Sequence, residues 1–122
     1  MVKQKFTLEN LILVVTYYHE KPIPLAKLIW SIILLQAKHN LFNVNIEDLI
    51  ATHYIEDIIS KLIDKGYLIV KADEVILTEK GVNKVNELLN QIDINDIKET
   101  LILIKYLSTT VIEGYALGKI FE

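Results

Sequence analysis

The fold is decided by the stretch His53-Tyr-Ile-Glu-Asp-Ile-Ile-Ser-Lys-Leu-Ile-Asp-Lys-Gly66, which continues directly as Tyr67-Leu-Ile-Val-Lys-Ala-Asp-Glu-Val-Ile-Leu-Thr-Glu-Lys-Gly81. Five apolar residues in its first half recur at the spacing of one helix face: Ile55, Ile58, Ile59, Leu62 and Ile63. This pattern predicts an amphipathic helix over residues 53–65 with a charged outer side. Gly66 supplies the positive φ that commonly ends a helix.

Two short β-prone segments follow this glycine. Residues 67–70 and 75–77 are rich in Ile, Val, Leu and Tyr, and residues 71–74 contain the turn between them. Thr78 then suits the N-cap of a helix over residues 79–91. The stretch therefore predicts helix, strand, turn, strand and helix, in that order.

Two longer helices are predicted ahead of this stretch. Thr7 caps a helix over residues 8–19 that is apolar nearly all round, and residues 25–39 follow the helical period up to a left-handed stop at Asn40. The prolines between the two helices break regular structure. Residues 41–44 are β-prone and are expected to form a small first strand, and Asn45 caps a short helix that begins at Ile46.

Two further helices are predicted after residue 91. One is expected to begin near Ile94, capped by Asp93 or Asn95, and Ser108 is expected to cap a last segment that reaches Phe121. The apolar residues of the first of these helices cover more than a single core face. The chain is therefore expected to end in helices with apolar surface to spare.

The composition indicates one domain that spans residues 1–122. Apolar residues make up 52% of the chain, there is no cysteine, and the net charge is −3. The longest apolar run is far shorter than the ~20 residues that span a bilayer, and the N-terminus lacks the pattern of a signal peptide. We therefore expect a cytoplasmic protein with no membrane partner, and the apolar surplus predicts self-association.

Three features together resemble the winged-helix transcription regulators of the MarR-like and PadR-like kind. They are the paired helices up to Lys65, the Lys65-Gly-Tyr-Leu-Ile exit into a strand, and the Leu77-Thr-Glu-Lys-Gly81 start of the next helix. The resemblance covers about residues 25–91. It implies an α-rich α+β fold, a winged helix-turn-helix with a short β-hairpin wing and additional helices at both ends.

The resemblance also implies a function and a division of labour. It suggests a small dimeric transcription regulator that binds double-stranded DNA, with the helix over residues 53–65 in the major groove and the wing at flanking phosphates. The helices over residues 8–19 and 94–121 would then mediate dimerisation. Six residues are predicted to contact nucleic acid: His53, Tyr54, Ser60, Lys61, Lys65 and Lys71.

The net negative charge of the segment that would contact DNA disfavours DNA binding. Residues 42–80 hold four lysines and eight acidic residues, a net charge of −4. Carboxylates near phosphates weaken binding, and a chain whose 13 basic residues are all lysine lacks the bidentate contact that arginine makes with guanine. The alternative therefore stays open: a winged-helix module for protein–protein interaction that does not bind DNA.

The expected homodimer has a predicted interface on the terminal helices. Five residues are assigned to it: Leu11, Val15, Leu101, Ile104 and Tyr115. Gly114 and Gly118 also have the small-xxx-small spacing that lets two helices approach closely. The motif is diagnostic mainly in membranes, so the surplus of apolar surface is the stronger reason to expect a dimer.

No motif in the sequence indicates catalysis. Neither GxxxxGK[ST] nor GxGxxG occurs, so we expect neither an enzyme nor a bound cofactor. His53 with Glu56 or Asp57 offers two metal ligands on one helix face, but no third is evident and no metal site is predicted. His19 and His39 lie at predicted helix ends, where the dipole favours a protonated imidazole.

Overall fold

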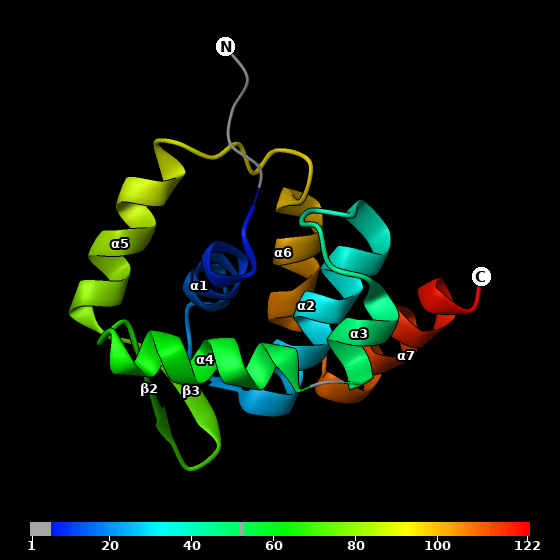
Figure 1. Cartoon of the computed structure of the whole chain (residues 1–122), viewed down its shortest axis with the longest axis horizontal. Coiled ribbons are helices and arrows are strands. Elements are labelled where there is room, and N and C mark those ends of the chain that lie inside the picture. Colours follow the sequence, from blue (N-terminus) through cyan, green and yellow to red (C-terminus); the bar gives the residue numbers. More distant parts are fainter. Residues whose placement is uncertain (1–5, 52) are drawn as a thin grey trace.

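The computed structural model describes residues 6–51 and 53–122. Within these ranges the chain is rich in helix and contains one small antiparallel sheet (Figure 1). The elements, in chain order, are α1 (Leu8–His19), β1 (Ile23–Pro24), α2 (Leu25–His39), α3 (Ile46–Ala51), α4 (Tyr54–Asp64), β2 (Leu68–Lys71), β3 (Glu74–Leu77), α5 (Glu79–Leu89), α6 (Lys98–Tyr106) and α7 (Thr109–Ile120). The α-rich α+β architecture predicted from the sequence is therefore observed.

The other helices assemble around α1, which Figure 1 shows near the middle of the molecule and almost end on. It begins where predicted, because Thr7 Oγ1 accepts a hydrogen bond from the Asn10 backbone N–H at 3.1 Å. It packs against α2, α4, α5 and α6, and most of its side chains are buried. A helix that is apolar nearly all round is thus covered on several sides by the same chain.

Four of the five residues predicted for a dimer interface belong to this core. Leu11 and Val15 on α1 are 0% and 1% exposed, and Leu101 and Ile104 on α6 are 2% and 1% exposed. The apolar stripes of α1 and α6 are turned inward, where the two helices pack together. The predicted interface is therefore wrong at these four positions, and only Tyr115 is exposed, at 58%.

Gln36 on α2 explains why residues 41–44 form no strand. Its Oε1 accepts hydrogen bonds from the backbone N–H groups of Leu41 at 2.8 Å and Phe42 at 3.2 Å. Its Nε2 donates to the carbonyl oxygens of Phe42 at 2.7 Å and Val44 at 3.0 Å. One buried amide satisfies backbone groups that a sheet would otherwise have to pair. The strand predicted here was wrong, and the first strand is β1, in the proline-containing segment between α1 and α2.

The sheet has the strand order β1-β3-β2 with both pairs antiparallel. Lys71 pairs with Glu74, so the hairpin turn consists of Ala72 and Asp73 alone, with φ of 53° and 61°. Positive φ at both central residues is the type I′ pattern, which matches the twist of the flanking strands. Both strands therefore extend one residue further into the turn than predicted.

Thr78 ties the end of α4 to the start of α5. Its Oγ1 donates to the Gly66 carbonyl oxygen at 2.6 Å and accepts from the Gly81 N–H at 3.0 Å. Gly66 has the expected positive φ, 82°, and a Cβ at Gly81 would lie only 2.2 Å from the carbonyl oxygen of Tyr67. The predicted cap and helix stop are confirmed, and Gly81 is required because the backbone at Tyr67, just before β2, passes so close to α5.

The first of the two C-terminal helices, α6, begins later than predicted. Asp93 Oδ1 accepts from the Asn95 N–H at 2.9 Å, which makes a turn rather than a helix cap, so α6 begins only at Lys98. Ser108 caps α7 as predicted, accepting from the Val111 N–H at 3.3 Å. α7 packs along α2 and α6 along α1. Figure 1 shows α7 on the opposite side of the molecule from α5.

Candidate functional site

The outer surface of α3, α4 and the β2–β3 hairpin forms what we call the presented face. On α4 the buried side chains are Ile55, Ile58, Ile59 and Leu62. Ile63, predicted to face inward with them, is 36% exposed and lies at the margin of the apolar stripe. The rest of α4 is directed toward solvent, as its period indicates.

All six residues predicted to contact nucleic acid are exposed. His53, Tyr54, Ser60, Lys61 and Lys65 lie on α4 or at its ends, and Lys71 ends β2. The hairpin follows the C-terminal end of α4 (Figure 1). The structure therefore groups five of the six along one helix and leaves Lys71 on the hairpin.

Several of these cationic groups are already engaged within the chain. Lys65 Nζ lies 3.1 Å from Glu9 Oε2, and His53 Nδ1 lies 2.6 Å from Glu56 Oε2. Lys80, near the hairpin, donates to the Lys65 carbonyl oxygen at 2.7 Å. Lys61 and Lys71 make no ion pair in the part of the chain that the structure describes. Of the three lysines on this face, Lys65 is therefore engaged within the described residues, whereas Lys61 and Lys71 are not.

Acidic residues outnumber them on the same face. Seven belong to α3, α4 or the hairpin: Glu47, Asp48, Glu56, Asp57, Asp64, Asp73 and Glu74. Against these stand Lys61, Lys65 and Lys71, so the face has a net charge of −4. Its potential attracts cations and repels polyanions.

Apolar side chains are interspersed with these charges, which the sequence pattern did not reveal. The exposed fractions are 44% for Ile50, 41% for Tyr54, 47% for Ile69 and 41% for Val70. The β-prone run of β2 predicted a strand but not its faces, because only Leu68 of that strand is buried. β2 is an edge strand, and an edge covers fewer of its side chains than a central strand does.

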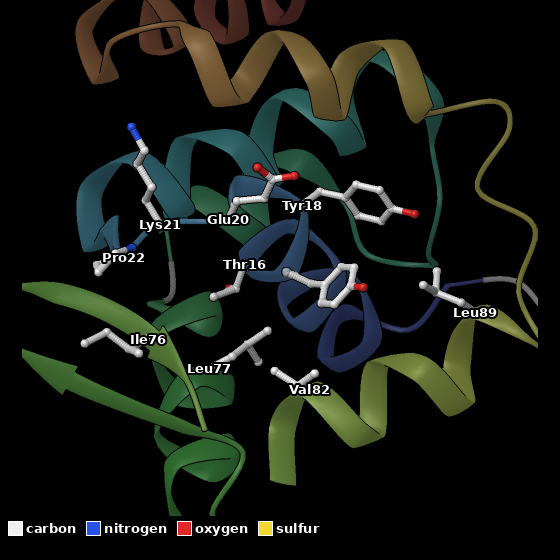
Figure 2. A pocket seen from close by; sticks show the side chains of 10 residues that line it. Thr16, Tyr18, Glu20, Lys21, Pro22, Ile76, Leu77, Val82 and Leu89 are labelled. Atoms are coloured by element: carbon white, nitrogen blue, oxygen red, sulfur yellow. The ribbon is translucent and has the colours of Figure 1, made fainter. Parts of the chain in front are cut away.

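A hollow of ≈ 590 Å³ lies on another side of the molecule, between α1, β3 and α5. Small-molecule sites in proteins have volumes of roughly 300–1,000 Å³ and mainly apolar linings. Figure 2 shows the side chains that line it, among them Thr16, Tyr18, Glu20, Lys21, Pro22, Ile76, Leu77, Val82 and Leu89. The size and lining suit a small apolar or aromatic molecule.

The polar groups of the hollow come from the end of α1. The rings of Tyr17 and Tyr18 meet edge to face, with centroids 5.4 Å apart, and burial together with Tyr17 raises the pKa of Tyr18. Glu20 is hydrogen-bonded and ion-paired to Lys105 of α6, which holds the pKa of its carboxyl below the usual value. Sequence reasoning missed this site because its walls come from two segments that are far apart in the chain, residues 16–22 and residues 76–89.

A buried polar pair joins α1 to α2. His19 Nδ1 donates to the Lys21 carbonyl oxygen at 2.8 Å, and Lys27 Nζ lies 2.9 Å from His19 Nε2. Burial lowers the pKa of His19 despite the Lys21 hydrogen bond, and the nearby Lys27 and Lys105 lower it further. Burial also lowers the pKa of Lys27. His19 is thus an internal hydrogen-bonding group in its neutral form and not the protonated helix cap that its position suggested.

His39 departs from the same expectation. Its Nε2 lies 3.2 Å from Thr100 Oγ1 on α6. Burial is the main cause that lowers the pKa of His39, and the nearby charge of Lys38 lowers it further, whereas Asp96 raises it. Both helix-end histidines therefore favour the neutral form, because tertiary burial outweighs the helix dipole.

In residues 6–51 and 53–122 no cluster of three or more His, Asp or Glu side chains is placed to hold a metal ion. None of the helices in these ranges has the length and apolar character needed to cross a bilayer. Comparisons of the chain with protein-family models, with curated proteins and with solved structures found no match.

Proposed function

We propose that this chain is a winged-helix domain that binds a basic segment of another protein through the presented face and has no catalytic role. The element order supports the winged-helix assignment. α3 and α4 are separated by only two residues, and the hairpin follows α4 directly. The order β1-β3-β2 sets β1 against the hairpin and leaves β2 at the edge, as a wing requires.

The charge of the presented face is the observation that carries the proposed partner class. The face has a net charge of −4 with His53 counted as neutral, and one of its three lysines, Lys65, is already paired with Glu9. A lysine- or arginine-rich protein segment would be drawn to this field, whereas a polyanion would be repelled by it.

Exposed apolar side chains on the same face offer a partner hydrophobic contacts in addition to charge attraction. Ile50 near the end of α3 and Tyr54 at the start of α4 are 44% and 41% exposed. Protein interfaces commonly bury an aromatic anchor inside a polar rim. The acidic residues of α3 and α4 flank these two side chains and favour a partner whose apolar residues alternate with cations.

Selection from a random peptide library tests the proposal. Displayed peptides are selected on the immobilised chain, and the amide shifts of the labelled protein are recorded with the best binder. We expect selected peptides to be enriched in Lys or Arg together with an aromatic or branched residue. The perturbed amides should lie in α3, α4 and the hairpin.

A matched pair of double variants provides the control. Glu56→Gln with Asp57→Asn removes two charges from the presented face, and Asp96→Asn with Glu99→Gln removes two exposed charges elsewhere. At about 0.2–1 kcal/mol for each exposed ion pair, the first variant should weaken peptide binding roughly twofold to thirtyfold. Equal effects of the two variants, or perturbed amides outside the face, would contradict the proposal.

Duplex DNA is the second candidate partner, because Tyr54, Ser60 and Lys61 are exposed on α4, the helix that a winged helix would place in the major groove. Fluorescence anisotropy with mixed-sequence duplexes over a salt series tests it. DNA binding predicts that log K falls by about 0.9 per phosphate contact for each unit of log[salt], and Lys61→Ala should reduce that slope by about one contact. Absence of binding at ~50 mM salt would remove this candidate and leave the protein partner.

A further inference from the structure

Exposed apolar side chains gather on the two C-terminal helices, away from the presented face. Of the eleven large apolar side chains that are exposed in the described residues, six lie between residues 102 and 121. These six define what we call the α6–α7 face: Ile102, Leu103, Tyr106, Val111, Tyr115 and Phe121. Soluble monomers rarely leave so many apolar groups exposed on neighbouring elements.

A shallow hollow connects the two helices on this face. It has a volume of ≈ 250 Å³ and lies between α2, α6 and α7. Leu103 of α6, Leu107 directly after α6 and Tyr115 of α7 are among its walls, together with Leu34 of α2. Two of the six exposed apolar side chains, Leu103 and Tyr115, therefore lie at this recess, one from each helix.

We infer that a second copy of this chain covers the α6–α7 face in a symmetric dimer. Fully buried aromatic side chains lose about 150–250 Å² each. With Tyr106, Tyr115 and Phe121 exposed at 75%, 58% and 82%, the three aromatics leave on the order of 400 Å² available per copy.

The aliphatic side chains bring this area into the range of a stable dimer. The three half-exposed aliphatic side chains, Ile102, Leu103 and Val111, add roughly 100 Å². Two copies then contribute about 1,000 Å² of apolar surface. Homodimer interfaces are about 65% apolar, so this corresponds to a total interface of about 1,500 Å², which is a standard size.

The charges of this segment permit self-pairing. Residues 98–122 contain Lys98, Lys105 and Lys119 against Glu99, Glu113 and Glu122, a net charge of zero. The presented face has a net charge of −4, so pairing with its own copy would place like charges together. The neutral face is the one that a second, identical copy fits.

The glycines of α7 add an independent observation. A Cβ at Gly114 or Gly118 would meet no atom of residues 6–51 and 53–122 within 4 Å, so none of these residues requires a glycine there. Glycine is also a poorer helix former than alanine, so both positions make α7 less stable than alanine would. Both lie beside Tyr115 on the exposed side of α7, where they allow the backbone of a second helix to approach closely.

Sedimentation equilibrium of the full chain tests the inference. We expect a dimer at about 50 μM, and Tyr115→Lys should raise the dissociation constant about 30-fold or more, as loss of an interface anchor does. Tyr54→Lys is the matched control, because Tyr54 is also a half-exposed helical tyrosine but lies on the presented face. It should leave the dissociation constant unchanged.

Gly114→Gln provides a second variant, since a Cβ at this exposed position meets no described atom within 4 Å. It should weaken the dimer while circular dichroism stays that of the wild type. A monomer at about 50 μM would overturn the inference. A dimer equally sensitive to Tyr54→Lys and Tyr115→Lys, or larger assemblies insensitive to Tyr115→Lys, would overturn it as well.

Discussion

α2 and α7 pack along one another, yet α2 buries several polar side chains and α7 exposes apolar ones. On α2 the polar residues Lys27, Ser31 and Gln36 are buried, with exposures of 7%, 0% and 3%. On α7 the apolar Val111 and Tyr115 are exposed at 41% and 58%. Each buried polar group of α2 makes a hydrogen bond within the chain: Lys27 to His19, Ser31 to a carbonyl of α2, and Gln36 to the following loop.

The comparison shows that hydropathy does not by itself assign the inside and the outside of a helix. A polar side chain can be buried when its hydrogen bonds are satisfied, and an apolar one is left outside when no element of the same chain covers it. On α2 the chain satisfies its own buried groups. On α7 it leaves a surface that a second copy is proposed to cover.

The largest expected effect tests which side of α7 is the inner one. Ile112 is 0% exposed and its neighbour Val111 is 41% exposed. Ile112→Ala should lower the free energy of unfolding by about 3 kcal/mol, because it removes buried methyl groups and leaves a cavity. Val111→Ala should change it by less than about 1 kcal/mol at protein concentrations where the chain is monomeric. Similar losses for the two variants in urea titrations would break the contrast within α7.

A second experiment addresses the buried amide of α2. Gln36→Leu keeps the size of the side chain but leaves the backbone groups of Leu41, Phe42 and Val44 without their partner. We expect a loss of about 2–3 kcal/mol, since an unsatisfied buried polar group costs about 1–3 kcal/mol and the loop can relax toward water. Gln91→Leu, at an exposed position, is the control and should be nearly neutral. A neutral Gln36→Leu would mean that the loop does not depend on this amide.

The glycines of α5 and α7 predict effects of opposite sign. Gly118→Ala should raise the stability of the monomer by about 1 kcal/mol, because its Cβ enters open space and alanine favours the helix. Gly81→Ala should lower stability by about 1–3 kcal/mol, because its Cβ would press against the Tyr67 carbonyl oxygen. Thermal unfolding of dilute samples measures both. A destabilising Gly118→Ala would show that α7 does not have the open outer side described here.

The smallest effect concerns the polar contact between α1 and α2. The pKa of His19 is lowered by burial, so above the ordinary value of 6.5 both folded and unfolded chains hold it neutral. Below pH 6.5 the unfolded chain takes up a proton that the folded chain resists, so stability falls as the pH drops toward the folded pKa. His19→Asn should flatten the decrease in stability between about pH 7.5 and 5.5, and a residual slope from His39 should remain.

Gln91→Asn, at an exposed position without a titrating side chain, is the control and should leave the slope close to that of the wild type. A slope that is unchanged by His19→Asn would show that the burial of His19 is not what excludes the proton.

The presented face was predicted from the sequence to a large extent. The period of Ile55, Ile58 and Leu62 assigns the inner side of α4, and Gly66 and Thr78 mark its end and the start of α5; all of these are local signals. The exposed Ile69 and Val70 were not foreseen, because the sequence does not show that β2 is an edge strand. The strand predicted at residues 41–44 failed because no local rule foresees capture by a side chain of α2.

By itself, the sequence determined most of the helices, the caps at Thr7, Thr78 and Ser108, the net charge of each segment, and the absence of cysteine and arginine. These follow from spacing and composition within one or two turns of chain. Only the tertiary structure decided which apolar surfaces the chain covers for itself. α1 and α7 have similarly apolar sequences, but α1 is enclosed by four helices and one side of α7 is left open. Burial depends on neighbours that are distant in sequence, and no local pattern contains them.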